Sequence, residues 1–240
     1  MALLFYLAAL VFALGLAYRL AIYARTPAPL KIPTTPAPTT QRGVVWRMFR
    51  EVVFFESLFK GNLWTWAFGM AFHLGLALET VRHLRYFFSS VPEWVTLVQP
   101  FGLYGGMLMV VGLGGLWGRR ILVPRIRYIS TPSDHLMLVL LLTIGFSGLT
   151  MKYLVRPDIL AVKEFILGLL RFDVQPFPAG FPVFIHLSMV ALLLLIFPFS
   201  KLLHAPGVFF SPTRNQVDDS REHRHIVAWA TSMESEKPHG

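Results

Sequence analysis

Five long apolar runs constrain this sequence more than any other feature, because each has about the twenty residues that an α-helix needs to cross a bilayer. Inside the hydrocarbon no water satisfies backbone polar groups, so runs this apolar cross as helices. We expect five membrane-spanning helices, at about Leu3–Tyr23, Leu63–Tyr86, Trp94–Trp117, His135–Tyr153 and Phe181–Leu203. Hydrophobic residues make up 55% of the chain and charged residues 15%, which is typical of a membrane protein. The predicted fold class is an all-α membrane protein.

The first run has no basic residue before it and no small-residue cleavage site, so we interpret it as a membrane helix and not as a signal peptide. The expected organisation is a first transmembrane helix (1–25), a cytoplasmic linker with an interfacial helix (26–62), a four-helix core (63–204) and a cytoplasmic partner-binding tail (205–240).

The formal charge of +9 follows the predicted topology. Basic residues gather in three segments: Arg25, Lys31, Arg42, Arg47, Arg50 and Lys60 between the first two runs, Arg119, Arg120, Arg125 and Arg127 between the third and fourth, and Arg214, Arg221, Arg224 and Lys237 after the fifth. The positive-inside rule then places the N-terminus outside and the C-terminus in the cytoplasm. We therefore attribute the basic excess to topology and to anionic lipid, and expect no nucleic-acid partner.

Two segments outside the runs have a distinct composition. Thr26–Thr40 is rich in proline and threonine and predicts an extended linker without packed structure. Val44–Gly61 mixes bulky apolar residues with charged ones and predicts an interfacial helix on the cytoplasmic surface, the alternative being an early start of the second span. Ile159–Leu170 is a weaker amphipathic candidate on the outer side.

Cysteine is absent, which excludes disulfides, cysteine-ligated iron–sulfur clusters and covalently attached haem of the usual kind. A histidine-held cofactor is then the remaining route for electron transfer. Of the eight histidines, His223, His225 and His239 lie in the tail. His135 follows TPSD, where Thr131 or Ser133 can cap a helix that has Pro132 in its first turn, so we interpret it as an interfacial residue at a helix start.

The other four histidines lie on only two runs, His73 and His83 on the second, His186 and His204 on the fifth. Ionisable side chains at membrane depth tend to face a functional site. Eighteen helical residues make five turns, so His186 and His204 are expected on one face, roughly 27 Å apart, whereas His73 and His83 are about 15 Å apart.

Antiparallel packing of the two runs pairs His83 with His186 near the outer face and His73 with His204 near the inner face. Tilt, ring offset and a bend at Pro198 must absorb the unequal spacing of the two pairs.

A flat gap between two imidazoles suits a b-type haem, since zinc or copper held by protein alone needs three or four ligands close together. Glycines on the second and third runs allow either room for a flat ligand or close helix packing. Arg82 and Arg85 are placed to meet haem propionates, or equally to anchor the helix at the interface.

Residues from the second run to His204 resemble the membrane cytochrome b (gamma) subunits of respiratory nitrate reductases. The resemblance lies in the ten-residue spacing of His73 and His83, the eighteen-residue spacing of His186 and His204, RRILVPRIR (Arg119–Arg127) and FPFSKLLH (Phe197–His204). It implies that all four histidines ligate two haem b groups, in the pairs given above. Relatives carry lysines near the start of the third span, associated with a quinol pocket, where this chain has Gln99 and no lysine.

Within this family, His204–Ile226 is most similar to the cytochrome b subunits of Dsr complexes, which serve dissimilatory sulfur metabolism. That resemblance implies several partners: a cytoplasmic iron–sulfur subunit related to heterodisulfide reductase, a second, quinone-interacting membrane subunit, and periplasmic multihaem c and iron–sulfur subunits.

The leading hypothesis is a di-haem electron-transfer subunit of a quinone-dependent oxidoreductase in a prokaryotic cytoplasmic membrane, with menaquinone or another quinone as a further cofactor. The alternatives are a nitrate-reductase-type cytochrome b subunit, a transporter whose histidines carry protons or bind a metal ion, and a cofactor-free assembly anchor.

Overall fold

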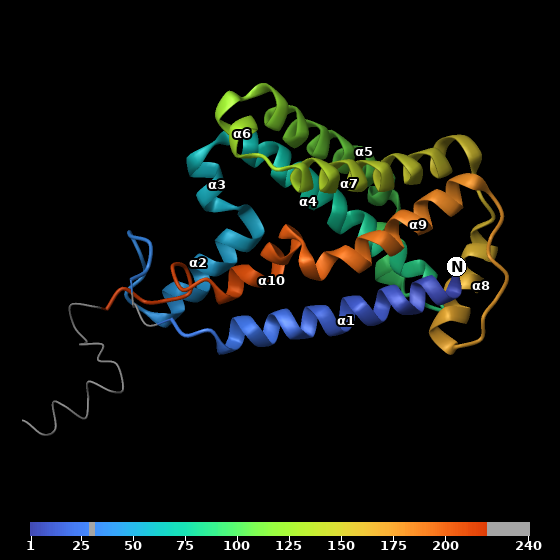
Figure 1. Cartoon of the computed structure of the whole chain (residues 1–240), viewed down its shortest axis with the longest axis horizontal. Coiled ribbons are helices and arrows are strands. Elements are labelled where there is room, and N and C mark those ends of the chain that lie inside the picture. Colours follow the sequence, from blue (N-terminus) through green and yellow to red (C-terminus); the bar gives the residue numbers. More distant parts are fainter. Residues whose placement is uncertain (29–31, 220–240) are drawn as a thin grey trace, which may run out of the picture. The chain divides into compact units, whose positions relative to one another are not determined.

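The computed structural model describes residues 1–28 and 32–219, and this part of the chain forms helices and turns without strands (Figure 1). The predicted linker residues 29–31 and the end of the predicted tail, with His223, His225 and His239, lie outside the described residues. The α-helices are α1 (Ala2–Arg25), α2 (Gln41–Phe54), α3 (Glu56–Gly61), α4 (Leu63–His83), α5 (Glu93–Leu122), α6 (Pro124–Ile129), α7 (Pro132–Thr150), α8 (Ile159–Arg171), α9 (Phe181–Ile196) and α10 (His204–Gly207). A π-helical turn (Met151–Val155) extends α7, and 3₁₀ turns cover Leu84–Tyr86, Phe197–Phe199, Lys201–Leu203 and Val208–Phe210.

The chain divides into two compact units, each described by itself. The first unit contains Met1–Leu14 and Ser57–Pro198, and the second contains Gly15–Glu56 and the described residues from Phe199 on. In the first unit, α4 packs on α5, α5 on α7, and α7 on α9. A small core of Phe165, Val183 and Leu187, with Phe5 packed against it, joins α8 and the start of α1 to the first turns of α9.

Among the described residues, four helices are long and apolar enough to cross a membrane: α1, α5, α7 with its π-helical turn, and α9 up to Phe199. They match the first, third, fourth and fifth predicted spans. The second predicted span corresponds to α4, which has 21 residues but includes His73, Glu79 and the tryptophans Trp64 and Trp66. Because these side chains lower its hydropathy, a membrane crossing by α4 stays a prediction.

The predicted start of the fourth span is confirmed. Thr131 caps α7, and its hydroxyl and backbone N–H both contact the carboxylate of Asp134 in a capping box, with Pro132 in the first turn. The side chains of Asn62 and Asp158 cap α4 and α8, and both residue types are common at this position. The amphipathic candidate at Ile159–Leu170 is α8, which ends one residue later.

The predicted span Phe181–Leu203 is interrupted near Pro198, where a bend was predicted, and α9 itself ends at Ile196. Pro198 has no backbone N–H and its ring crowds the carbonyl of Leu194, so the regular helix cannot continue. Ser200 is extended, with φ −106° and ψ 169°, and its hydroxyl caps the next turn. The five-turn argument that placed His186 and His204 on one helical face therefore fails.

The predicted interfacial helix is two helices. Phe55 adopts a left-handed conformation, with φ 51° and ψ 47°, and separates α2 from α3. Asn62 is extended, and its side chain caps α4, so α3 and α4 are separate helices. The alternative that this stretch simply begins the second span early is therefore wrong.

The prediction that the proline-rich linker has no packed structure is also wrong for its described residues. The backbone N–H of Thr34 donates to the carbonyl of Thr213 at 2.8 Å, and the N–H of Asp218 donates to the carbonyl of Pro38 at 2.9 Å. The linker pairs with the segment after α10.

Glycines on α4 and α5 serve close helix packing. A Cβ atom at Gly75 would lie 2.5 Å from the carbonyl oxygen of Gly105, and one at Gly112 would lie 2.5 Å from the backbone nitrogen of Phe72. Backbone atoms cannot move aside as side chains can, so these positions require glycine for the observed contact. At Gly75 and Gly112 the structure supports helix packing over room for a ligand.

Replacing Gly112 with alanine is expected to destabilise the first unit, since overpacking at a tight contact costs about 1–3 kcal/mol. Gly114 on the same helix is the matched control, because nothing lies within 4 Å of a Cβ there. Thermal unfolding in detergent should show a lower transition temperature for Gly112→Ala and no loss for Gly114→Ala. Equal transition temperatures for both variants would contradict the close α4–α5 packing.

Candidate functional site

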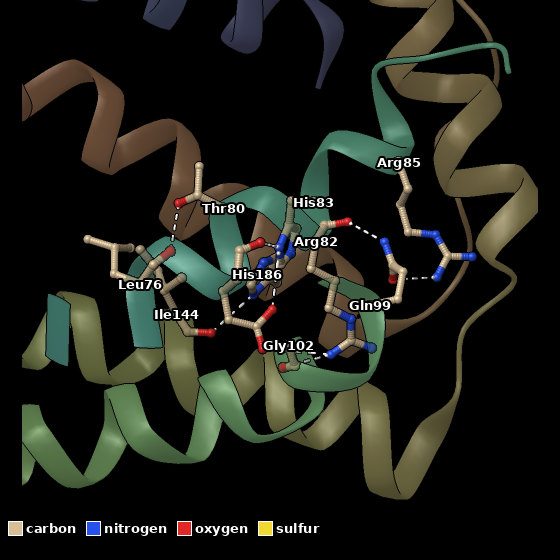
Figure 2. Close-up of polar contacts among 10 residues, drawn as sticks. Leu76, Thr80, Arg82, His83, Arg85, Gln99, Gly102, Ile144 and His186 are labelled. Carbon is tan, nitrogen blue, oxygen red and sulfur yellow. Dashed lines mark hydrogen bonds and ion pairs between the residues drawn. The ribbon is translucent and has the colours of Figure 1, made fainter. Parts of the chain in front are cut away.

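His83 and His186 come together in the first unit. His83 is the last residue of α4 and His186 lies in the second turn of α9. Their ring centroids are 6.2 Å apart and their planes differ by 14°. Figure 2 shows the two imidazoles next to each other. The predicted meeting of these two side chains is thus present.

Hydrogen bonds fix the tautomer of both rings. The Nδ1 atom of His83 lies 2.6 Å from the carbonyl oxygen of Glu79, and that of His186 lies 3.2 Å from the carbonyl oxygen of Ile144 and 3.0 Å from the hydroxyl of Ser147. A carbonyl only accepts, so each Nδ1 must carry the hydrogen. The unprotonated Nε2 atom of each neutral ring then keeps its lone pair for a metal ion.

His73 and His204 have the same local arrangement. The Nδ1 atom of His73 lies 2.8 Å from the carbonyl oxygen of Gly69, and that of His204 lies 2.9 Å from the carbonyl oxygen of Lys201. His204 also lines a groove of about 650 Å³ that is bounded by the end of α1. His73 belongs to the first unit and His204 to the second. Their pairing stays a prediction.

His135 differs from these four in its hydrogen bond. Its Nδ1 atom accepts from the indole N–H of Trp117 at 3.1 Å, so Nδ1 is unprotonated and Nε2 carries the hydrogen of the neutral ring. This bond ties the start of α7 to α5. The interpretation of His135 as a residue at a helix start is confirmed.

Arg82 and Arg85 lie beside His83 but turn toward α5 (Figure 2). The guanidinium of Arg82 donates to the carbonyl of Gly102 at 3.2 Å and lies 3.7 Å from the carboxylate of Glu79. Arg85 donates to the side-chain oxygen of Gln99 at 3.4 Å, and the Gln99 amide donates to the carbonyl of Arg82 at 3.2 Å. Both arginines therefore fasten the end of α4 to α5, and their role toward propionates stays a prediction.

Sequence reasoning missed three groups around the imidazole pair. Glu79 precedes His83 by one helical turn, and its carboxylate lies 3.5 Å from Nδ1 of His83, a proximity that the four-residue spacing could have indicated. Ser147 and the carbonyl of Ile144 contact His186 from α7. No local signal could have found these two, because 39 and 42 residues separate them from His186.

Comparison with known proteins identifies the family. The family model described as nitrate reductase gamma subunit matches residues 56–218, which include all four candidate ligands. This chain belongs to the nitrate reductase gamma subunit family. The match excludes α1 and α2 and ends shortly after the described turn at Val208–Phe210.

Two archaeal relatives are similar over nearly the whole chain. One from Archaeoglobus fulgidus is 37% identical, covering 93% of this chain and 81% of the relative, and one from Archaeoglobus profundus is 34% identical, covering 95% and 82%. Both are named Hdr-like menaquinol oxidoreductase cytochrome b-like subunit. Family membership and four apolar helices make this chain a multi-pass membrane protein, and its prokaryotic relatives point to a cytoplasmic membrane.

The donor set of this family member fits a haem. His83 and His186, with ring centroids 6.2 Å apart and both Nδ1 atoms bonded to carbonyls, would hold the haem iron through their Nε2 atoms. In the described part of the chain, no three His, Asp or Glu side chains gather as a metal site would require. Two imidazoles suffice for a haem, since the porphyrin supplies four nitrogens of its own.

Gln99→Leu is expected to lower stability by about 1 kcal/mol, since it removes the bonds to Arg82 and Arg85 while keeping the side-chain size. Gln41→Leu is the matched control at an exposed helix start, where the change should stay within about 0.5 kcal/mol. Thermal unfolding of both variants in detergent measures the difference. An unchanged transition temperature for Gln99→Leu would show that these bonds do not hold α4 to α5.

Proposed function

We propose that this chain is the di-haem cytochrome b subunit of a quinone-dependent membrane oxidoreductase. It carries electrons between the quinone pool and a cytoplasmic iron–sulfur partner. The observation that carries the proposal is the His83–His186 pair, whose centroids are 6.2 Å apart and whose Nδ1 atoms are both committed to backbone carbonyls. Family membership and the two relatives named as cytochrome b-like subunits support it.

In this proposal His83 and His186 hold one haem b, and His73 and His204 hold the second. The Nδ1–carbonyl bond that His73 and His204 share with the first pair supports the second assignment. α4 serves as a fifth membrane span, with the N-terminus of the chain outside and its C-terminus in the cytoplasm, as the distribution of arginine and lysine indicates. The first haem then lies near the outer face and the second near the cytoplasm.

The chain's own residues set the properties of such a site. When bound, haem supplies a one-electron iron couple. The carbonyls of Glu79 and Ile144 orient the two rings and increase the donor strength of their Nε2 atoms. His186 is the more enclosed of the two rings, since Ser147 and the carbonyl of Ile144 contact it from α7, whereas the His83 side chain is 47% exposed. Glu79 is the carboxylate nearest to His83, 3.5 Å from its Nδ1 atom.

The partners follow from the relatives. A menaquinol oxidoreductase described as Hdr-like requires a quinone and an assembly of several subunits. We propose a cytoplasmic iron–sulfur subunit of the heterodisulfide reductase type, a second quinone-interacting membrane subunit, and periplasmic multihaem c and iron–sulfur subunits. Participation in dissimilatory sulfur metabolism is part of the same proposal.

Alanine substitution of the histidines tests the function. His83→Ala or His186→Ala should remove about half of the b-type signal in a reduced-minus-oxidised absorbance spectrum, and His73→Ala or His204→Ala the other half, because each haem would lose one of the two histidines that hold it. His135→Ala is the matched control and should keep both signals, since its Nε2 carries the hydrogen. A colourless wild-type protein, or a full spectrum in all four variants, would defeat the proposal.

Ser147 provides a finer test. Ser147→Ala leaves the Nδ1 hydrogen of His186 with the carbonyl of Ile144 as its acceptor, so the ring becomes a weaker donor. A weaker donor stabilises the oxidised iron less, so the midpoint potential of one haem should rise while that of the other stays unchanged. Ser147→Thr keeps the hydroxyl and is the control. Redox titration followed by absorbance measures both, and an unchanged potential in Ser147→Ala would count against His186 as a ligand.

A further inference from the structure

The polarity of α2 is inverted relative to a helix on the surface of a soluble protein. Its outward side chains are large and apolar, between 37% and 69% exposed: Val45, Trp46, Phe49, Val52 and Val53. Trp46 stacks on Phe49 with centroids 5.2 Å apart, and Phe49 meets Phe54 edge to face. A contiguous apolar face of this kind indicates a surface that another phase or molecule covers.

Three of the four charged side chains of α2 make polar contacts within the second unit. Arg47 donates to the carbonyl of Thr34 at 2.9 Å. Glu51 accepts from Arg214 at 2.6 Å, and Arg50 donates to Glu56 at 2.6 Å. Each charge that lies on the inner face of the helix therefore has a partner within the second unit.

The linker and the segment after α10 cover this charged face. Thr34 and Pro38 pair through their backbones with Thr213 and Asp218. Pro38 also lies directly against α2, since a Cβ at Gly43 would come within 2.6 Å of the Cβ of Pro38. Together with the Glu51–Arg214 bond, these contacts fasten residues 211–218 to α2, and we call this contact set the tail clip.

We propose that α2 lies in the interfacial region of a bilayer that contains anionic lipid, with its aromatic face among the acyl chains. The tail clip covers the charged face on the opposite side. The proposal goes beyond electron transfer, because it needs no haem and concerns a segment outside the family match. It assigns a lipid-binding surface to residues 45–53.

Three observations favour lipid over a protein partner. α1, which is long and apolar enough to cross a membrane, ends at Arg25, and the apolar helix α4 begins at Leu63, so α2 is tethered on both sides to apolar helices. Tryptophan, here Trp46, is typical of the membrane–water interface. Arg42 is exposed and the Arg50 side chain is 42% exposed, and both cations are complementary to anionic headgroups.

Single cysteines test the proposal without background, because the chain has none of its own. Val45→Cys and Val53→Cys carry a nitroxide label in the full chain, reconstituted into vesicles of phosphatidylcholine with phosphatidylglycerol. Thr39→Cys, exposed just before the helix, is the matched control. The collision rate of the nitroxide label with oxygen, which partitions into lipid, is compared with its collision rate with a water-soluble nickel chelate.

The ratio of oxygen to nickel collisions should be several-fold higher at positions 45 and 53 than at position 39. A ratio at 45 and 53 equal to that at 39 would place the face in water and overturn the proposal. Protection from both reagents would show that a second copy or a protein partner covers the face, which also overturns it. An absorbance spectrum of the same samples measures haem independently of the collision ratio. If the ratios are as expected but no haem is present, the result contradicts the proposed function and leaves the lipid-binding surface in place.

A second substitution tests the tail clip. Arg214→Gln removes the charge that pairs with Glu51, so the ratio at position 45 should fall toward that of position 39. Arg125→Gln, at an exposed residue of α6, is the control and should leave it unchanged. An unchanged ratio in Arg214→Gln would overturn the role of the clip in orienting α2.

Discussion

The hydrogen bond from a ring Nδ1 to a backbone carbonyl is the interaction on which the candidate site depends. His73 and His83 each use the carbonyl four residues earlier in α4, an oxygen that already accepts the helical backbone bond and has a second lone pair to offer. A helical side chain leans toward the N-terminus of its helix, which brings the ring to that carbonyl. The helix itself therefore sets the tautomer and leaves Nε2 available for a metal ion.

His186 reaches the same state by a different route, because its acceptors belong to α7. The position of His83 relative to His186 accordingly depends on three packed pairs, α4 with α5, α5 with α7, and α7 with α9. Gly75 and Gly112 allow the first of these contacts, and the bonds of Gln99 hold its outer end. Residues far from the rings thus contribute to their separation.

Much of this arrangement is predictable from sequence, for a physical reason. The bilayer imposes a length and a composition on a span, so hydropathy located α1, α5, α7 and α9 within a few residues, and the TPSD segment located the start of α7 by its cap. Apart from the His83–His186 pair, contacts between distant segments were not predictable. The Ser147 bond and the tail clip join residues that carry no local signal of each other. The linker shows the limit most clearly, since its composition does not predict the backbone hydrogen bond from Thr34 to Thr213.

The break after α9 removes a difficulty in pairing the histidines. A continuous helix would separate His186 from His204 by about 27 Å, whereas His73 and His83 on α4 are about 15 Å apart, so antiparallel helices could not match both levels. Because α9 ends at Ile196 and Ser200 is extended, the eighteen-residue spacing no longer fixes that distance. His204 takes its orientation from the turn at Lys201 and from its own Nδ1 bond to that residue's carbonyl. In the proposed pairing, the break at Pro198 is the feature that would let His186 and His204 serve two sites at the shorter spacing of His73 and His83.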